Sequence, residues 1–287
     1  MDKELLNKLK YLCKKKKSLF EIKETLGLTE DEIFMCLNML GIKFNFDLDG
    51  NIHKPYEIDK TTYIIPNNKE KLSLIFLGDT HLSSKYDDVD KIKRVYDMPC
   101  DYYFHCGDFT DGFVPVIDYE KHLKETTYEG QLGYSLHYYP VSDRKTFIVN
   151  GNHDEYLYKI YNRDIVKEIC DVRDELIYLG PKERRVKIGT FDMLIMHGDR
   201  DSKTGSSIKM EKYVNSIIDK PDLIHLGHKH TYCDMTVSNV ELIRTPSLMK
   251  QIPHKRFDNY ESGIYKVDIV FDDDEKVKSI TKKRVII

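Results

Sequence analysis

The 287-residue sequence contains neither Trp nor Ala, and it has no long apolar run. Its longest purely apolar stretches are of the size of Leu74–Leu77, whereas a helix that spans a membrane needs about 20 such residues. The first residues, Met1–Glu4, are not followed by the apolar segment of a secretory signal. The sequence therefore predicts no membrane span and no signal peptide, and the cytoplasm is the expected compartment.

Paired cysteines and an excess of one charge are missing as well. The six cysteines lie far apart without a C-x-x-C pair, which argues against a zinc ribbon or a thioredoxin-like site and predicts buried or unreactive thiols. Lys and Arg number 45 and Asp and Glu 48, so the net charge of −3 gives no overall attraction to nucleic acid or to an acidic membrane. A nucleic-acid partner would have to be met by a local basic patch.

What is present begins with helical periodicity near the N-terminus. Apolar residues recur at helical spacing within Leu5–Leu12, Leu19–Leu26 and Ile33–Leu40. This pattern predicts three short helices. Thr29 precedes Glu32 by three residues, which is the spacing of a capping box, and it therefore marks the expected start of the third helix.

A hairpin signal follows the three helices. An Asp49-Gly50 turn separates two short β-prone runs, so that residues 1–60 resemble a helix-turn-helix module of the winged-helix type. Such a module binds DNA, but its third helix opens with Glu30-Asp31-Glu32, whose carboxylates repel DNA. Residues 1–20, by contrast, carry seven Lys and two acidic residues. DNA contact through the basic first helix, and contact with a protein partner or a second copy, both stay open.

From about residue 70, short β-prone runs alternate with polar or helical stretches, which indicates an α/β domain. Five of these runs end in a cluster of metal-capable side chains. Because the carboxyl ends of strands in an open α/β sheet face the ligand crevice, we expect the five clusters to converge. They are Gly78–His81, His105–Asp108, Asn150–Asp154, His197–Asp199 and Gly227–His230.

The clusters predict a site for two metal ions. Asp, His and Asn supply oxygen and nitrogen donors that suit Mn, Fe, Zn or Ni. The candidate ligands are too many for one ion and about right for two ions that share a carboxylate. Two ions roughly 3.5–4 Å apart clamp the oxygens of an in-line phosphoryl displacement. The seven candidates are Asp79, His81, Asp108, Asn152, His197, His228 and His230.

The clusters also follow the motif order of a known family. The sequence resembles the calcineurin-like metallophosphoesterase superfamily over roughly residues 72–270. This resemblance implies an α/β fold, a β-sandwich flanked by helices, in a domain at residues 70–287. The matches to D-x-H, G-D-x-x-D, G-N-H-[DE], H-G and G-H-x-H are, in that order, Asp79-Thr80-His81, Gly107–Asp111, Gly151–Asp154, His197-Gly198 and Gly227–His230.

The resemblance also implies a role for each residue of the site. Two divalent ions are implied, Mn foremost, with Fe, Zn, Ni or Mg as alternatives. His153 would protonate the leaving oxygen or stabilise the transition state, and Asp111 would orient His153. Asp108 would bridge the two ions. The first ion would be held by Asp79, His81 and His230, and the second by Asn152, His197 and His228.

The motif forms favour nucleic acid as the substrate. They look most like those of the SbcD-type DNA repair nucleases, although phosphodiesterases of small nucleotides carry similar motifs. The C-terminal DNA-capping domain of the SbcD type is not expected, since the segment after His230 reads as closing strands. Arg200 and Lys203 follow the ligand His197 in a loop rich in donors. They either bind a substrate phosphate or form surface ion pairs.

The insert between Asp108 and Asn152 contains five Tyr residues together with Lys and His. It either stacks bases and contacts phosphates, or forms a partly buried helical excursion. The sequence thus predicts a two-metal phosphodiesterase of nucleic acid, meaning a DNA nuclease. One alternative is a phosphodiesterase of a small or cyclic nucleotide. Another, without catalysis, is a protein that binds nucleic acid or a partner on the same scaffold.

Overall fold

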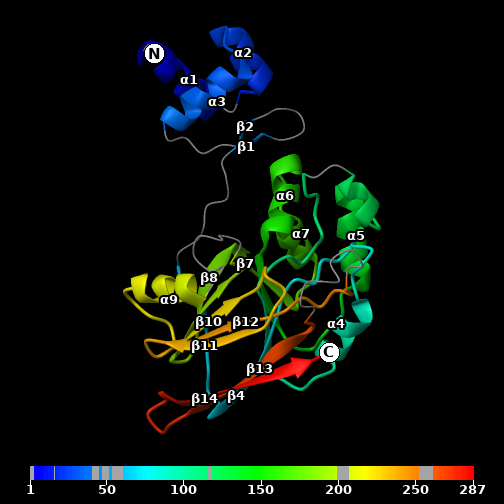
Figure 1. The fold of residues 1–287 in the computed structure, drawn as a ribbon, viewed down its shortest axis with the longest axis vertical. Helices are drawn as coiled ribbons and strands as arrows, with labels where there is room; N and C mark the ends of the chain where they lie inside the picture. The colour runs from blue at the N-terminus through cyan, green and yellow to red at the C-terminus, as the bar shows by residue number, and fades with distance from the viewer. Residues whose placement is uncertain are drawn as a thin grey trace. The chain divides into compact units, whose positions relative to one another are not determined.

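The structure is a computed structural model (Figure 1). It describes residues 3–15, 17–40, 45–46, 52–53, 61–115, 118–198, 207–251 and 261–287. The chain divides into two compact units. One comprises residues 1–57 and 157–163, and the other comprises residues 58–156 and 164–287. Among the described residues, every helix is too short or too polar to traverse a bilayer.

The N-terminal residues form three helices, as their periodicity predicts. The helices are α1 (Lys3–Lys14), α2 (Leu19–Leu26) and α3 (Glu30–Met39). The apolar stripes meet in a small core, and the burial of these side chains is the main force that holds such short helices in place. The core residues are Leu9, Leu12, Ile22, Ile33, Cys36 and Leu37.

Two capping boxes define where these helices begin. At α3 the backbone N–H of Thr29 donates to Glu32 Oε2 at 2.8 Å and the N–H of Glu32 donates to Thr29 Oγ1 at 3.3 Å, which confirms the predicted box. Ser18 and Glu21 form a second box at α2. The strands β1 (Asn45–Phe46) and β2 (Ile52–His53) then pair antiparallel, as the hairpin signal predicts. The Asp49-Gly50 turn lies outside the described residues, and the winged-helix assignment stays a prediction.

The second unit contains two six-stranded mixed sheets. The order of the first sheet is β14-β13-β4-β5-β6-β7, in which β4 to β7 run parallel. Its strands are β4 (Lys71–Leu77), β5 (Tyr102–His105), β6 (Thr146–Asn150), β7 (Leu176–Pro181), β13 (Gly263–Phe271) and β14 (Val277–Ile286).

The order of the second sheet is β11-β12-β10-β9-β8-β3, in which β9, β10 and β12 are parallel. One buried apolar cluster draws on both sheets, including Phe76 and Phe104 from the first and Val186 and Ile195 from the second. This cluster confirms the β-sandwich. The strands are β3 (Tyr63–Ile65), β8 (Glu183–Ile188), β9 (Phe191–Met196), β10 (Leu223–Leu226), β11 (Cys233–Val237) and β12 (Val240–Arg244).

Helices flank both sheets. Met210 and Val214 of α9 (Ser207–Ser216) pack on apolar residues of β10 and β12. The helices α4, α5 and α7 lie together on the other side (Figure 1). The bounds of the flanking helices are α4 (Val89–Tyr96), the 3-10 turn η1 (Tyr119–His122), α5 (Tyr128–Tyr138), α6 (Asn152–Tyr161) and α7 (Ile165–Val172).

The sandwich begins earlier in the chain than residue 70. Strand β3 pairs parallel with β8, and Ile65 is buried in the shared core. The predicted domain of residues 70–287 therefore omits one strand of its own sheet. A three-residue strand leaves too short a period-2 pattern to be found from the sequence.

Candidate metal centre

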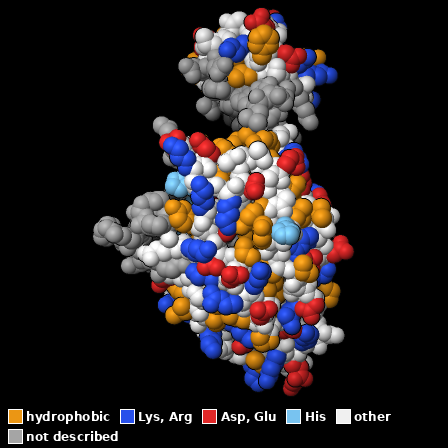
Figure 2. All heavy atoms as spheres, turned by 90° about the vertical axis from the view of Figure 1, so that its right-hand side faces the viewer, with side chains coloured by type: hydrophobic (Ala, Val, Ile, Leu, Met, Phe, Trp, Pro, Cys, Tyr) orange, Lys and Arg blue, Asp and Glu red, His pale blue; other side chains and the backbone are white. Residues whose placement is uncertain are grey.

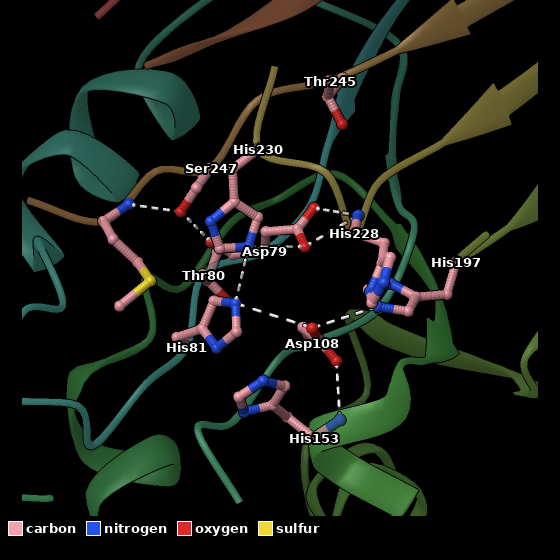
Figure 3. Close-up of polar contacts among 12 residues, drawn as sticks. Asp79, Thr80, His81, Asp108, His153, His197, His228, His230, Thr245 and Ser247 are labelled. Carbon is pink, nitrogen blue, oxygen red and sulfur yellow. Dashed lines mark hydrogen bonds and ion pairs between the residues drawn. The ribbon is translucent and has the colours of Figure 1, made fainter. Parts of the chain in front are cut away.

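The metal-capable clusters follow five strand ends. Three of them, after β4, β5 and β6, lie at the same edge of the first sheet because these strands are parallel. The other two follow β9 and β10, which are parallel neighbours in the second sheet. Figure 3 shows six of the candidate ligands pointing toward one centre, namely Asp79, His81, Asp108, His197, His228 and His230. The structure thus brings the expected clusters together.

The backbone at this centre is unusual. Five of the seven candidate ligands adopt the left-handed conformation, with φ of 51° at Asp79, 43° at His81, 51° at Asp108, 68° at His228 and 53° at His230. A non-glycine residue in this region costs on the order of 1 kcal/mol or more, and such residues gather at functional sites. These backbone conformations produce sharp turns, which direct successive side chains toward the same point.

Two glycines allow the carboxylates to come close to the backbone. A Cβ on Gly151 would lie 2.1 Å from Asp108 Oδ1, and a Cβ on Gly227 would lie 2.5 Å from Asp79 Oδ2. Both distances are far below van der Waals contact. Any side chain at either position would therefore displace a candidate ligand.

Asp79, His81 and His230 form the first group of candidate ligands, with one ligand atom of each lying within 4.8 Å of the others. Nε2 of His230 lies 3.2 Å from Asp79 Oδ1 and 3.2 Å from Nε2 of His81. His81 Nδ1 lies 3.0 Å from a carboxylate oxygen of Asp111, to which it donates its proton. In the neutral imidazole this leaves a lone pair on Nε2, so that the unprotonated nitrogen of His81 faces the group.

Asp108, His197 and His228 form the second group. His197 Nδ1 donates to the carbonyl oxygen of Cys106 at 2.9 Å, which fixes its neutral tautomer and leaves a lone pair on Nε2. That Nε2 lies 3.1 Å from Asp108 Oδ2 and 2.9 Å from Asn152 Oδ1. With His197 in this neutral form, three electron-pair donors converge here. A shared cation satisfies all three, and the residues fit a metal ion.

Asp108 lies between the two groups. Its Oδ2 is 3.7 Å from Nε2 of His81 in the first group and 3.1 Å from Nε2 of His197 in the second. Its Oδ1 accepts the backbone N–H of His153 at 2.9 Å, which fixes the carboxylate plane. This is the position that a bridging carboxylate requires.

The protonation states also suit metal binding. Burial alone would raise the pKa of Asp79 and of Asp108, but electrostatic interactions and hydrogen bonds with neighbouring histidines lower both, and the pKa of Asp108 lies well below its ordinary value. Burial lowers the pKa of His81 and of His228. Ionised carboxylates and neutral imidazoles are the forms that bind divalent ions.

His153 differs from the ligand histidines. Its Nδ1 donates to the backbone carbonyl of Asp111 at 2.7 Å, so its Nε2 is directed away from that contact. Burial would lower the pKa of His153, but the charges of Asp108 and Asp111 outweigh it and raise the pKa. Its ring packs edge-on against His81, with centroids 4.5 Å apart. An imidazole that retains its proton beside a metal group is suited to act as an acid.

Asp111 differs in detail from the expectation that its carboxylate orients His153. The carboxylate lies 3.0 Å from Nδ1 of His81 and 3.5 Å from Nδ1 of His153. Its backbone carbonyl makes the shorter contact with His153. Asp111 therefore holds a candidate ligand with its side chain and the candidate acid with its backbone.

Two further residues act at the site without having been predicted. The buried carboxylate of Asp154 accepts the backbone N–H groups of Phe109, Thr110 and Gly151, and so ties the Asp108 loop to the Asn152 loop. Burial, and then the charge of Asp108, raises its pKa to about 6. Its position in the Gly151–Asp154 motif was the sequence signal from which a role at the site could have been predicted. Tyr119 places its hydroxyl 3.4 Å from His153 Nδ1, and no sequence signal distinguished it from the other tyrosines.

The two predicted substrate-binding residues cannot be placed, whereas the Tyr-rich insert can be described for the most part. Arg200 and Lys203 lie outside the described residues. In the insert, Tyr128 and Tyr139 are buried and cannot stack bases, whereas Tyr138 is 43% exposed. Tyr128 and Tyr139 thus agree with a partly buried helical excursion, and base stacking stays a prediction for the exposed Tyr138.

Residues 72–256 match the family profile described as the calcineurin-like phosphoesterase superfamily domain. The chain belongs to this superfamily. The match confirms the resemblance at the level of the superfamily, and the likeness to SbcD-type nucleases stays a prediction. No curated protein matches the chain.

Several solved structures are similar to this calcineurin-like phosphoesterase at low identity. An archaeal phosphodiesterase is 17% identical, covers 75% of this chain and 100% of its own, and has a TM-score of 0.43. Vps29 from Entamoeba histolytica complexed with zinc is 16% identical over 75% and 99%, with a TM-score of 0.40. The phosphoesterase YfcE from E. coli is 13% identical over 73% and 98%, with a TM-score of 0.39. None of these likenesses bears on the substrate.

Proposed function

We propose that this calcineurin-like phosphoesterase is a two-metal phosphodiesterase that acts on nucleic acid, with DNA as the foremost substrate. The observation that carries the proposal is the convergence of lone pairs around Asp108, where His81, His197 and Asn152 all present unprotonated donors. The first ion would be held by Asp79, His81 and His230, and the second by Asn152, His197 and His228, with Asp108 shared.

When bound, such ions activate water as a nucleophile and neutralise charge on the phosphoryl oxygens. Mn suits this set of imidazole and carboxylate donors. The protein's own residues transfer the proton and orient the groups that take part. His153 donates a proton from Nε2 to the leaving oxygen, while the Asp111 carbonyl holds its ring. The Asp111 carboxylate accepts the Nδ1 proton of His81, so that the lone pair of this ring is on Nε2, which faces the other ligands.

The proposal of nucleic acid as substrate has support from outside the metal centre. In α1, Lys8, Lys14 and Lys15 are exposed together with Tyr11, which is 59% exposed. Lysines interleaved with an aromatic ring suit a strand of nucleic acid. The exposed residues of α3 include Glu32 and the apolar Met35 and Met39, and these side chains do not suit contact with nucleic acid. We therefore assign the DNA contact of the N-terminal module to α1, with a protein partner as the other candidate.

Removal of metal provides the first test. We expect EDTA to abolish hydrolysis of bis(p-nitrophenyl) phosphate, because the neutral histidines and ionised carboxylates cannot activate water without a cation. After dialysis, Mn should restore turnover more fully than Ca, which prefers oxygen ligands. Metal content is measured in parallel by mass spectrometry. Full activity in a protein shown to be metal-free would contradict the proposal.

The substrate is tested by comparing the turnover of four candidates in the presence of Mn. They are single-stranded DNA, duplex DNA, a cyclic nucleotide and bis(p-nitrophenyl) phosphate. In the full chain with Lys8, Lys14 and Lys15 all changed to Gln, we expect weaker DNA cleavage and unchanged hydrolysis of the nitrophenyl ester. The salt dependence of DNA binding should flatten by about 0.7 per lost contact for a single strand.

The matched control changes three exposed lysines of the C-terminal hairpin, Lys276, Lys278 and Lys283, to Gln. It removes the same charge and should leave DNA cleavage unchanged. Equal losses in the two variants would show that only net charge matters. Hydrolysis of the cyclic nucleotide without cleavage of either DNA would overturn the nuclease and favour the small-nucleotide enzyme.

A further inference from the structure

A polar cleft with a volume of about 390 Å³ lies beside α4 and α5. This is the size of a site for one small ligand group. Figure 2 faces the side of the molecule that carries these helices, and there Lys and Arg side chains are interspersed with carboxylates and apolar groups. The residues that could contact a ligand are Asp90, Lys93, Lys124, Tyr134, Tyr138 and Lys250.

The cleft also contains Asp87 and Asp88, but the carboxylates of both already have partners. Asp87 is buried, with Oδ1 at 2.5 Å from Lys124 Nζ and Oδ2 accepting the backbone N–H of Ser83. Asp88 accepts the backbone N–H of Lys91 as the N-cap of α4. Lys124 thus offsets the charge of Asp87, and Lys91 Nζ, at 3.8 Å from Asp88 Oδ2, offsets that of Asp88.

Two lysine side chains of the cleft are accessible to a ligand. Lys250 is exposed, and Lys93 lies 3.9 Å from Asp90, with the side chains 58% and 90% exposed. A surface pair of this kind contributes little and separates easily. Lys93 and Lys250 lie far apart in the sequence but line the same cleft. An anionic group is therefore the complementary ligand.

The cleft also has an aromatic wall. The rings of Tyr134 and Tyr138, one turn apart on α5, have centroids 4.3 Å apart. Lys124 donates to the hydroxyl of Tyr134 at 2.7 Å, which anchors that ring. Tyr138 is 43% exposed beside it. A partly exposed ring supported by a fixed one is a suitable surface for stacking a base.

The segment that lines the cleft is directly connected to the metal centre. It begins after the candidate ligand His81, whose carbonyl accepts the backbone N–H of Ser84 at 3.0 Å. The insert is held to the same segment by Lys124, whose N–H donates to the Ser83 carbonyl at 2.7 Å. Lys250 donates its N–H to the Tyr86 carbonyl at 2.7 Å. Binding in the cleft would thus be fixed relative to His81.

We propose that this cleft binds one nucleotide of a single-stranded nucleic acid whose scissile phosphodiester lies at the metal centre. The base stacks on Tyr138, and the phosphate is bound by Lys93 and Lys250. This inference rests on the proposed function and names a subsite for its substrate.

The test measures binding of a fluorescein-labelled single-stranded oligonucleotide to the full-length protein by anisotropy in EDTA, where no cleavage occurs. Tyr138→Ala should raise Kd about tenfold, because loss of a stacked base costs on the order of 1–3 kcal/mol. Tyr138→Trp should restore binding. Lys93→Gln with Lys250→Gln should raise Kd and flatten its salt dependence. Asp90→Asn should lower Kd, since it removes the one exposed carboxylate of the cleft.

The matched control is the pair Lys278→Gln and Lys283→Gln, which should leave Kd unchanged. A wild-type protein that does not bind the oligonucleotide, or a Kd unaffected by Tyr138→Ala and by the Lys93 and Lys250 changes, would overturn the subsite. Failure of the proposed function has a different signature. In that case, the Mn-loaded wild type leaves DNA intact even where the cleft variants weaken binding in EDTA.

Discussion

Asp108→Ala is expected to abolish phosphodiester hydrolysis and to reduce bound metal from two ions per chain to one or none. One oxygen of Asp108 lies near a ring nitrogen of each group, 3.7 Å from His81 Nε2 and 3.1 Å from His197 Nε2. Its loss removes a ligand from each ion, not from one alone. It also leaves the backbone N–H of His153 without its acceptor. We expect kcat for bis(p-nitrophenyl) phosphate to fall by at least about a thousandfold.

Two measurements distinguish a loss of catalytic activity from a loss of folded protein. Metal content is determined by mass spectrometry after dialysis, and the thermal midpoint is determined without metal. Without metal, the variant leaves the His153 N–H without its acceptor, so the thermal midpoint is compared with that of the metal-free wild type, and a small decrease is expected. Asp274→Ala, at an exposed position, serves as a control and should retain two ions. A variant that keeps both ions and wild-type turnover would exclude Asp108 as the bridging ligand.

The convergence of the site could be predicted from the sequence because it depends on connectivity. Asp79, Asp108 and Asn152 each follow a strand, and the three strands are parallel neighbours, so their ends must meet. The sharp turns could be anticipated from the adjacent glycines, of which Gly151 and Gly227 prove to be needed for close approach. The N-terminal helices follow from apolar spacing and from Thr29 with Glu32.

Other features could not be predicted, because spacing does not say which atom of a residue makes a contact. Asp111 holds His153 through its carbonyl, and a sequence motif records only side chains. Tyr119, Tyr128 and Tyr139 have the same side chain, yet the first lies beside His153 and the other two are buried. Tyr139, for example, is buried against Tyr96 and Phe109, which lie about 30 to 45 residues earlier in the chain, and spacing does not reveal such contacts.

His153→Asn should differ in kind from Asp108→Ala, because it should keep the metal and lose only acid catalysis. The backbone N–H of His153, which binds Asp108, remains. The Asn amide nitrogen can occupy the place of Nδ1 and donate to the Asp111 carbonyl, as the imidazole does at 2.7 Å. What the variant lacks is Nε2 with its transferable proton.

The consequence depends on the leaving group. A nitrophenolate is a weak base and departs without protonation, whereas the alkoxide of a nucleotide or alkyl ester needs a proton. We therefore expect kcat to fall by about 10²–10⁴ for DNA and alkyl esters and by far less for nitrophenyl esters. A series of aryl and alkyl phosphodiesters should give a steeper dependence of log kcat on leaving-group pKa in the variant than in the wild type.

Tyr119→Phe is the matched control for a merely structural change next to His153. It removes the hydroxyl 3.4 Å from Nδ1 but leaves the imidazole and its proton in place. Its dependence on leaving-group pKa should match that of the wild type, whatever its effect on kcat. If His153→Asn instead lowers kcat equally for nitrophenyl and alkyl esters while both ions stay bound, His153 acts by stabilising charge on the phosphoryl oxygens and is not the acid.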